Sequence, residues 1–161
     1  MPNIDGYMKV TGQSQGAILG GVTQKGKEGM ITVNDLTYGL ISPRDAASGQ
    51  ATGRRQHQPV QVTVPTGRQT PKLFTAEVNN ENLTLVEIDF WLPAAGGGGG
   101  QALGFVLKLT NAHVSELDVS FESAGNTGEL LDQYSFTFQK IELTWTNPLT
   151  VAIDDWSSQP T

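Results

Sequence analysis

The chain of 161 residues contains no cysteine and few charged residues. Without cysteine it cannot be a disulfide-stabilised scaffold or hold a zinc ion with thiolates. No run of about 18 apolar residues occurs, so we expect no membrane-spanning helix. Only 16% of the residues are charged, which excludes a long-helix protein, because such proteins are rich in Glu and Lys. The first residues show no basic segment followed by an apolar one, so we expect no secretory signal.

Charge is divided unevenly along the chain. Residues 1–72 carry eight Lys and Arg against four Asp and Glu, whereas residues 73–161 carry two against twelve. The basic half lacks the interleaved aromatic residues of single-strand binders, so we expect no nucleic-acid partner. Two interpretations stay open: surfaces of opposite sign that dock copies of the chain on one another, or an intermixing of the charges on folding.

Apolar and polar residues alternate in many short runs, as they do in strands. The predicted strands are Tyr7–Val10, Ala17–Val22, Gly29–Val33, Val60–Val64, Asn82–Leu92, Leu103–Leu109 and Leu117–Phe121. Five consecutive glycines, Gly96–Gly100, cannot hold a regular element and predict a mobile hairpin loop. The sequence leaves open whether that loop would face a pore, a partner or solvent.

The run Tyr134–Trp145 combines two apolar faces. Tyr134, Phe136 and Phe138 share one parity, whereas the apolar residues that follow, up to Trp145, share the other. Either a bulge near residues 139–140 resets the register, or the strand is buried on both sides.

One segment, Arg68–Asn80, has a helical pattern. Thr70 is the expected N-cap and Pro71 the first helical residue, and the apolar stripe consists of Leu73, Phe74 and Val78. The predicted fold is mainly β, within a single domain over residues 1–161: a small β-barrel of two packed antiparallel sheets with one short helix and a long extended loop.

That loop is Ser42–Gln58, which is polar, lacks an apolar period and contains three of the ten basic residues. Structureless loops of this length are uncommon in compact domains unless they are functional or disordered. It is either a solvated surface loop or an arm that becomes ordered by lying on another molecule. In the second case its arginines could form paired hydrogen bonds to carboxylates of another copy.

Several stretches of the sequence resemble the Hcp (hemolysin-coregulated protein) family, the tube proteins of bacterial type VI secretion. The stretch 42–57, SPRDAASGQATGRRQH, carries the most specific similarity, which extends over nearly the whole chain. The other matching stretches are Gln15–Gly20, Thr23–Val33, Lys108–Ala112, Ser135–Trp145 and Asp154–Trp156.

The resemblance implies a β-barrel with one flanking helix and an extended loop. It also implies hexameric rings that stack into a hollow tube, a contractile sheath around the tube, a spike at its tip and effector cargo in its lumen. The protein would be assembled in the cytoplasm and secreted by the type VI machine without a signal peptide. We therefore expect a structural subunit that binds copies of itself, the sheath, the spike and cargo, with no membrane partner.

In the family this loop contacts a neighbouring subunit. By resemblance, the expected interface residues are Arg44, Asp45, Gln50, Thr52, Arg54, Arg55 and His57. We expect no catalytic residues, no cofactor and no metal. Gly21–Lys27 matches a phosphate-binding loop only up to its lysine, because Glu28 follows where Ser or Thr is needed. The Asp154–Trp156 tail is either a docking segment or a frayed terminus.

Two other classes of function stay open. A monomeric barrel that binds carbohydrate or peptide would expose aromatic residues, for which Trp91, Trp145 and Trp156 are the candidates. A hydrolase would use Glu87 or Asp89, which share one strand face, and would show a strongly shifted carboxyl pKa in a cleft. A tail-tube subunit of a phage-like particle would share the fold of the type VI tube.

Overall fold

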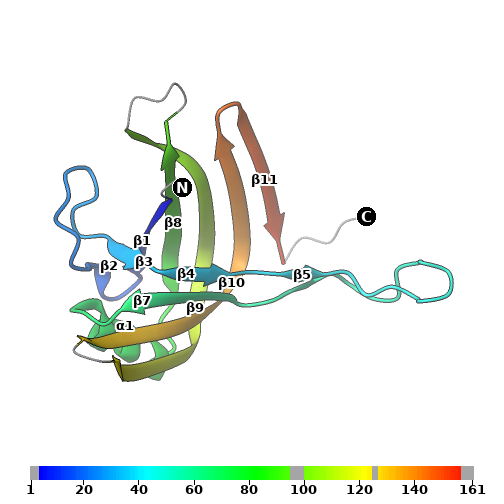
Figure 1. The fold of residues 1–161 in the computed structure, drawn as a ribbon. Helices are drawn as coiled ribbons and strands as arrows, with labels where there is room; N and C mark the ends of the chain where they lie inside the picture. The colour runs from blue at the N-terminus through cyan, green and yellow to red at the C-terminus, as the bar shows by residue number, and fades with distance from the viewer. Residues whose placement is uncertain (1–3, 95–99, 125–126, 157–161) are drawn as a thin grey trace.

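The computed structural model describes residues 4–94, 100–124 and 127–156, and most of them lie in strands (Figure 1). The predicted mobile loop Gly96–Gly100 lies outside the described residues, except for Gly100, so this prediction is not tested. The strands are β1 (Asp5–Gly12), β2 (Gly16–Ile18), β3 (Ile31–Val33), β4 (Asp35–Thr37), β5 (Leu40–Ile41), β6 (Gln56–His57), β7 (Val60–Pro65), β8 (Leu83–Pro93), β9 (Gln101–Ala124), β10 (Thr127–Thr146) and β11 (Leu149–Asp155).

Nine antiparallel strands form one sheet that wraps around the core. The order along the sheet is β2-β1-β8-β9-β10-β7-β4, with β11 added to β10 and β3 added to β1. The segment 31–37 joins the two ends of this order, because β3 pairs with β1 whereas β4 pairs with β7. The remaining strands, β5 and β6, form a separate two-stranded sheet. The predicted fold class, mainly β with one helix, is confirmed, and no helix among the described residues could span a membrane.

The two predicted strands at Leu103–Leu109 and Leu117–Phe121 are one continuous strand, β9. The predicted bounds were too short, because the intervening Ala112 and Val114 are buried and continue the core. The predicted strand Ala17–Val22 was instead too long. β2 ends at Ile18, and the loop that follows closes through a backbone hydrogen bond from the amide of Gly20 to Gly29 (2.8 Å).

The two apolar faces of Tyr134–Trp145 meet at residues 139–140, but no bulge lies there. β10 keeps one register with β9 across this point, Phe138 with Ala112 and Ile141 with Leu109, and the register shift in this run lies between Ser135 and Phe136. Burial on both sides stays a prediction, because it requires a neighbouring subunit, and Trp145 is 44% exposed in the single chain. Near the point where the buried face changes, Asn111 of β9 adopts a left-handed backbone with φ of 53°.

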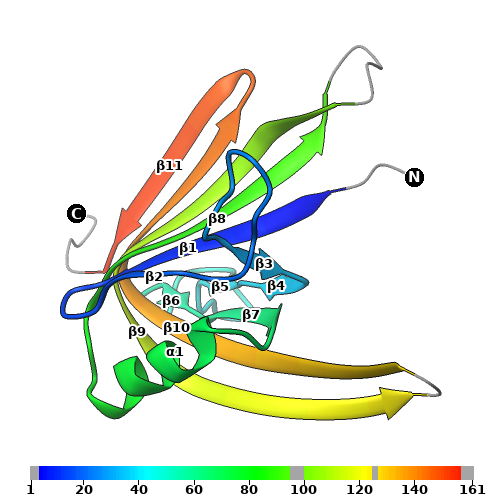
Figure 2. The ribbon, with the colours of Figure 1, turned by 90° about the vertical axis from the view of Figure 1, so that its left-hand side faces the viewer.

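The helix α1 (Gln69–Val78) covers one end of the barrel (Figure 2). It begins two residues before the predicted Pro71, and the N-cap is Arg68 rather than Thr70. Leu73 is buried as expected, but the predicted apolar stripe was wrong, because Phe74 and Val78 are exposed. The helix ends before Asn80, whose φ of 51° is typical of a helix C-terminus.

A buried carboxylate attaches the start of this helix to the barrel. Asp132 on β10 is fully buried and accepts hydrogen bonds from the hydroxyls of Thr66 (2.6 Å), Thr70 and Tyr134 (2.5 Å). Burial, together with the hydrogen bond to Asp132, raises the pKa of Tyr134, so its phenol stays protonated as a donor. Three donors therefore compensate for the loss of water around this carboxylate.

We expect the substitution Asp132→Ala to lower the free energy of unfolding by about 3 kcal/mol, because it leaves the buried hydroxyl of Tyr134 and the partly buried hydroxyls of Thr66 and Thr70 without this acceptor. Urea unfolding followed by tryptophan fluorescence measures this loss. The exposed Asp118 on the paired strand provides the control, and Asp118→Ala should change the free energy by less than about 0.5 kcal/mol. Equal effects of the two variants would contradict the anchoring role of Asp132.

Candidate functional site: the projecting arm and its anchor

The loop predicted at Ser42–Gln58 is a hairpin that projects from the barrel (Figure 1). We call the segment Leu40–His57 the arm. Its two sides are joined by β5 and β6, by a bridge between Arg44 and Ala51, and by the amide of Thr52 donating to the carbonyl of Pro43 (2.9 Å). Backbone hydrogen bonds within the arm therefore join its two sides from the base to the tip.

The tip of the arm is a closed turn built around Asp45. Its carboxylate accepts a hydrogen bond from the hydroxyl of Ser48 (2.7 Å), and its backbone amide donates to the carbonyl of Gln50 (2.8 Å). Gly49 takes a left-handed backbone with φ of 73°, which glycine adopts without steric cost. The hydrogen bond from Ser48 lowers the pKa of Asp45, so this acceptor stays ionised at neutral pH.

Most side chains of the arm face solvent. Arg44, Thr52 and Arg54 are exposed, and so are two apolar residues near the base, Leu40 (53%) and Ile41 (50%). Among the described residues, no carboxylate lies within ion-pair distance of Arg44 or Arg54. The arm thus combines exposed apolar area with two guanidinium groups that have no carboxylate partner in the part of the chain that the structure describes.

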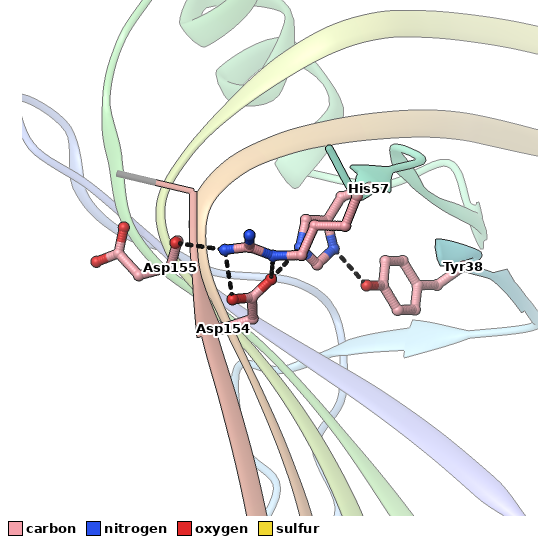
Figure 3. Close-up of polar contacts among 5 residues, drawn as sticks. Tyr38, His57, Asp154 and Asp155 are labelled. Carbon is pink, nitrogen blue, oxygen red and sulfur yellow. Dashed lines mark hydrogen bonds and ion pairs between the residues drawn. The ribbon is translucent and has the colours of Figure 1, made fainter. Parts of the chain in front are cut away.

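At the base of the arm, Arg55 and His57 bind the same carboxylate, that of Asp154 on β11 (Figure 3). Arg55 donates twice, through Nε to Oδ2 (2.5 Å) and through Nη2 to Oδ1 (2.8 Å). Its Nη2 also donates to the backbone carbonyl of Asp155 (3.2 Å). This paired geometry is the strong form of a charged hydrogen bond, and it attaches the arm to the last strand of the barrel.

His57 adds a buried contact to the same anchor. Its Nε2 lies 2.6 Å from Oδ2 of Asp154 and its Nδ1 lies 2.6 Å from the hydroxyl of Tyr38. A proton on Nε2 satisfies the carboxylate and leaves Nδ1 to accept from the tyrosine. Phe138 and Trp156 pack on the imidazole, with ring centroids 5.3 and 4.8 Å away. The ring is thereby fixed between the barrel and the chain end.

The electrostatics of the anchor follow from these contacts. Hydrogen bonds from Arg55 lower the pKa of Asp154 from its usual 3.8, partial burial opposes the change, and His57 lowers the pKa further. Burial and the nearby charge of Asp154 raise the pKa of Tyr38, which keeps its hydroxyl protonated. The anchor is therefore a carboxylate, ionised at neutral pH, held by one guanidinium and one imidazole.

The structure places the seven predicted interface residues in two groups. Arg44, Asp45, Gln50, Thr52 and Arg54 lie on the exposed arm, whereas Arg55 and His57 form the anchor with Asp154. Sequence reasoning missed Asp154 as their partner, because 99 and 97 residues separate it from them. The expectation of a frayed tail was wrong for the described part, since β11 extends to Asp155 and Trp156 packs on His57.

A carboxylate whose pKa is raised rather than lowered lies on β8. Asp89 is only 9% exposed, and burial together with Glu87 raises its pKa from 3.8 to about 7, whereas Lys9 opposes the shift. One oxygen of Asp89 and the indole nitrogen of Trp91 are buried without a hydrogen-bond partner. Lys27, from the segment that resembles a phosphate-binding loop, lies over the ring of Trp91 at 4.4 Å. This lysine is therefore buried in the fold.

The fold and its anchor define a small β-barrel protein with a projecting hairpin arm. The chain belongs to the Hcp family of type VI secretion tube proteins, because the family model described as "Type VI secretion system effector, Hcp" matches residues 7–145. It is similar to the "Major exported protein" of Pseudomonas aeruginosa, with 32% identity over 94% of this chain and 95% of that protein.

Solved structures agree with this assignment. A crystal structure of an Hcp protein superposes with a TM-score of 0.87 at 24% identity, covering 98% of this chain and all of the other. The secreted protein Hcp3 from Pseudomonas aeruginosa gives a TM-score of 0.79 at 25% identity, covering 97% of this chain and 100% of that one. The barrel and helix therefore follow the family fold.

We expect Asp154→Asn to lower the free energy of unfolding by about 1–2 kcal/mol at pH 7, because it removes the charged acceptor of Arg55 and His57. The pKa of Asp154 is depressed in the folded state, so its contribution is present above pH 3.8 and disappears as the pH falls through the folded-state pKa. Unfolding curves of both proteins from pH 3 to 7 measure this. A difference that stays constant over this range would contradict the ionic anchor.

The contribution of Asp89 to stability should depend on pH with the opposite sign. Its pKa is raised on folding, so the folded state holds the extra proton and loses stability as the pH rises from about 4 to about 7. Asp89→Asn removes the cost of the buried charge and should stabilise the protein by about 1–2 kcal/mol at pH 8, with a smaller gain at pH 5. Thermal unfolding at both pH values measures this. The exposed Asp35→Asn is the control, for which we expect no such pH dependence.

Proposed function

We propose that this chain is the structural subunit of a type VI secretion tube, in which six copies close into a ring and rings stack into a hollow tube. The observation that carries the proposal is an arm whose two sides are joined by its own backbone hydrogen bonds, which exposes most of its side chains and is fixed at its base. Such an arm costs little conformational entropy when it docks, because it is already ordered. Membership of the Hcp family supports the same role.

In the proposed subunit interface, the arm contacts the surface of a neighbouring subunit through five exposed residues: Arg44, Asp45, Gln50, Thr52 and Arg54. Arg55 and His57 set the direction of the arm. Exposed ion pairs contribute only about 0–1 kcal/mol each. The arginines alone would not hold a ring, so apolar area must also be buried. Leu40 and Ile41 supply such area at the base of the arm.

The other roles in the proposal concern the assembled tube. A contractile sheath would surround it, a spike would lie at its tip, and effector cargo would travel in its lumen. We propose that residues 1–161 act as one domain, assembled in the cytoplasm and secreted by the type VI machine without a signal peptide. The "Major exported protein" relative supports secretion.

We further propose that this function has no catalytic step. The raised pKa of Asp89 is the one observation that favours a hydrolase. Its side chain, however, is covered by the fold and is only 9% exposed, so a substrate could not reach it without a rearrangement. Burial beside Glu87 accounts for the shift without any catalytic role.

Removing residues 49–53, which close the tip of the arm, should convert rings into soluble monomers, because the subunits lose their docking element. Gel filtration and negative-stain images measure the change, and an unchanged circular dichroism spectrum shows that the barrel still folds. A deletion variant that still forms rings would refute the role of the arm. A wild-type protein that stays a compact monomer would favour the monomeric binding module instead.

A matched pair of charge variants tests the arginines separately. Arg44→Gln with Arg54→Gln removes two cations from the arm, and Lys25→Gln with Lys72→Gln removes two exposed cations elsewhere. We expect only the first pair to raise the protein concentration needed for ring formation, by about tenfold, because about 1.4 kcal/mol is lost. Equal shifts for the two pairs would show that net charge alone is responsible.

A further inference from the structure

An apolar groove lies where the barrel opens between β8 and β9 on one side and the segment 31–37 on the other. Its volume is about 520 Å³. We call it the mouth groove, and its principal lining residues are Gly6, Val33, Leu36, Phe90, Phe105 and Trp145. None of the arm residues lines it, because the arm leaves the barrel in another direction (Figure 1).

One wall of the mouth groove is a row of aromatic rings on neighbouring strands. Phe105 on β9 pairs with Phe90 on β8 and with Trp145 on β10, so all three side chains share one face. The rings of Phe90 and Phe105 have centroids 6.0 Å apart. Trp145 remains 44% exposed. Exposed contiguous apolar surface of this kind marks an interaction site.

The charges around the mouth groove are acidic. Asp35 lines the groove itself, and Asp5 and Glu129 line an adjoining hollow of about 520 Å³ that shares Gly6 and Val33 with it. Within the described residues, no Lys or Arg lines either hollow. An occupant should therefore be apolar in the middle and basic at its edge.

The arm has this combination of properties. Leu40 and Ile41 are about half exposed, and Arg44 lies three residues beyond Ile41, with Arg54 on the opposite side of the hairpin. Because a strand rises about 3.3 Å per residue, Ile41 and Arg44 are about 10 Å apart. This spacing allows an apolar contact in the groove and an ionic contact at its edge at the same time.

The arm cannot fill the groove of its own barrel while the anchor holds. Leu36 lines the groove, and two residues later Tyr38 is bonded to His57, so the chain leaves the groove and enters the arm within a few residues. Arg55 and His57 then fix the arm on Asp154, pointing away from the body (Figures 1 and 3). Each copy therefore presents an arm and a separate groove.

We propose that the mouth groove of one copy receives the arm of a second copy. Leu40 and Ile41 cover the aromatic row, while Arg44 and Arg54 face Asp35 and its acidic neighbours. This contact joins two different surfaces, so it can repeat from copy to copy and close into a ring. The inference rests on the proposed function, since it names the surface on which the arm of the tube subunit docks.

Disulfide trapping tests the contact directly, because the natural chain has no cysteine. One protein carries Ile41→Cys in the arm and a second carries Trp145→Cys in the groove. When they are mixed and mildly oxidised, we expect disulfide-linked heterodimers, since a disulfide needs Cα atoms within about 7 Å. Val78→Cys, exposed on the helix, replaces Trp145→Cys in the control and should give at least tenfold less product.

Charge reversal gives the second readout. Asp35→Lys should reduce the ring fraction on gel filtration at least tenfold, and combining it with Arg44→Glu and Arg54→Glu should restore rings. Asp118→Lys, on the β9–β10 hairpin, is the matched control and should leave the rings intact. Restoration is a result that a merely misfolded Asp35→Lys variant could not give.

These outcomes distinguish a failure of the groove proposal from a failure of the tube proposal. If rings form in the Asp35→Lys variant and no disulfide forms between positions 41 and 145, the groove proposal is overturned and the tube proposal stands. A cargo peptide would then be the alternative occupant of the groove. If the wild-type protein forms no ring, the tube proposal fails. In that case the disulfide between the two cysteine variants tests the groove proposal by itself. Its formation supports the contact between arm and groove, and its absence overturns that contact.

Discussion

The position of the arm depends on one carboxylate. Asp154 receives Arg55 and His57 from the base of the arm, and its own strand, β11, belongs to the barrel. A hairpin attached only by its two chain connections would sample many directions. Three hydrogen bonds to one carboxylate, with aromatic rings packed around the imidazole, reduce these directions to one. A surface that must meet a second molecule in a fixed orientation requires such a restriction.

The same anchor brings the two differently charged halves of the chain together. The basic first half supplies Arg55, and the acidic second half supplies Asp154, so these opposite charges meet within one copy. The intermixing of charges on folding therefore applies to this pair. Arg44 and Arg54 on the arm and the acids near the groove stay at the surface, and their docking between copies stays a prediction.

Strand alternation and the specific sequence of the loop were enough to predict the fold class and the family. They were not enough to predict where the buried face of β10 changes, because that change lies beside the left-handed backbone of Asn111 in another strand, which leaves no mark in the sequence of β10. The helix pattern failed at Phe74 and Val78, since an apolar residue on a helix can face outward. The partner of Arg55 left no local signal, because Asp154 lies 99 residues further along the chain.

The segment 31–37 carries consequences beyond topology. It pairs with β1 and with β7, lines the groove through Leu36, and continues through Tyr38 into the arm. The β4–β7 ladder and the β5–β6 ladder run in one line (Figure 1). Tension applied to the tip of the arm would pull β4 and β7 in the same direction, so it would load in shear the hydrogen bonds that join β7 to β10, rather than those between β4 and β7. A ladder loaded in this way yields only when several bonds break at once, whereas one peeled from its end opens bond by bond.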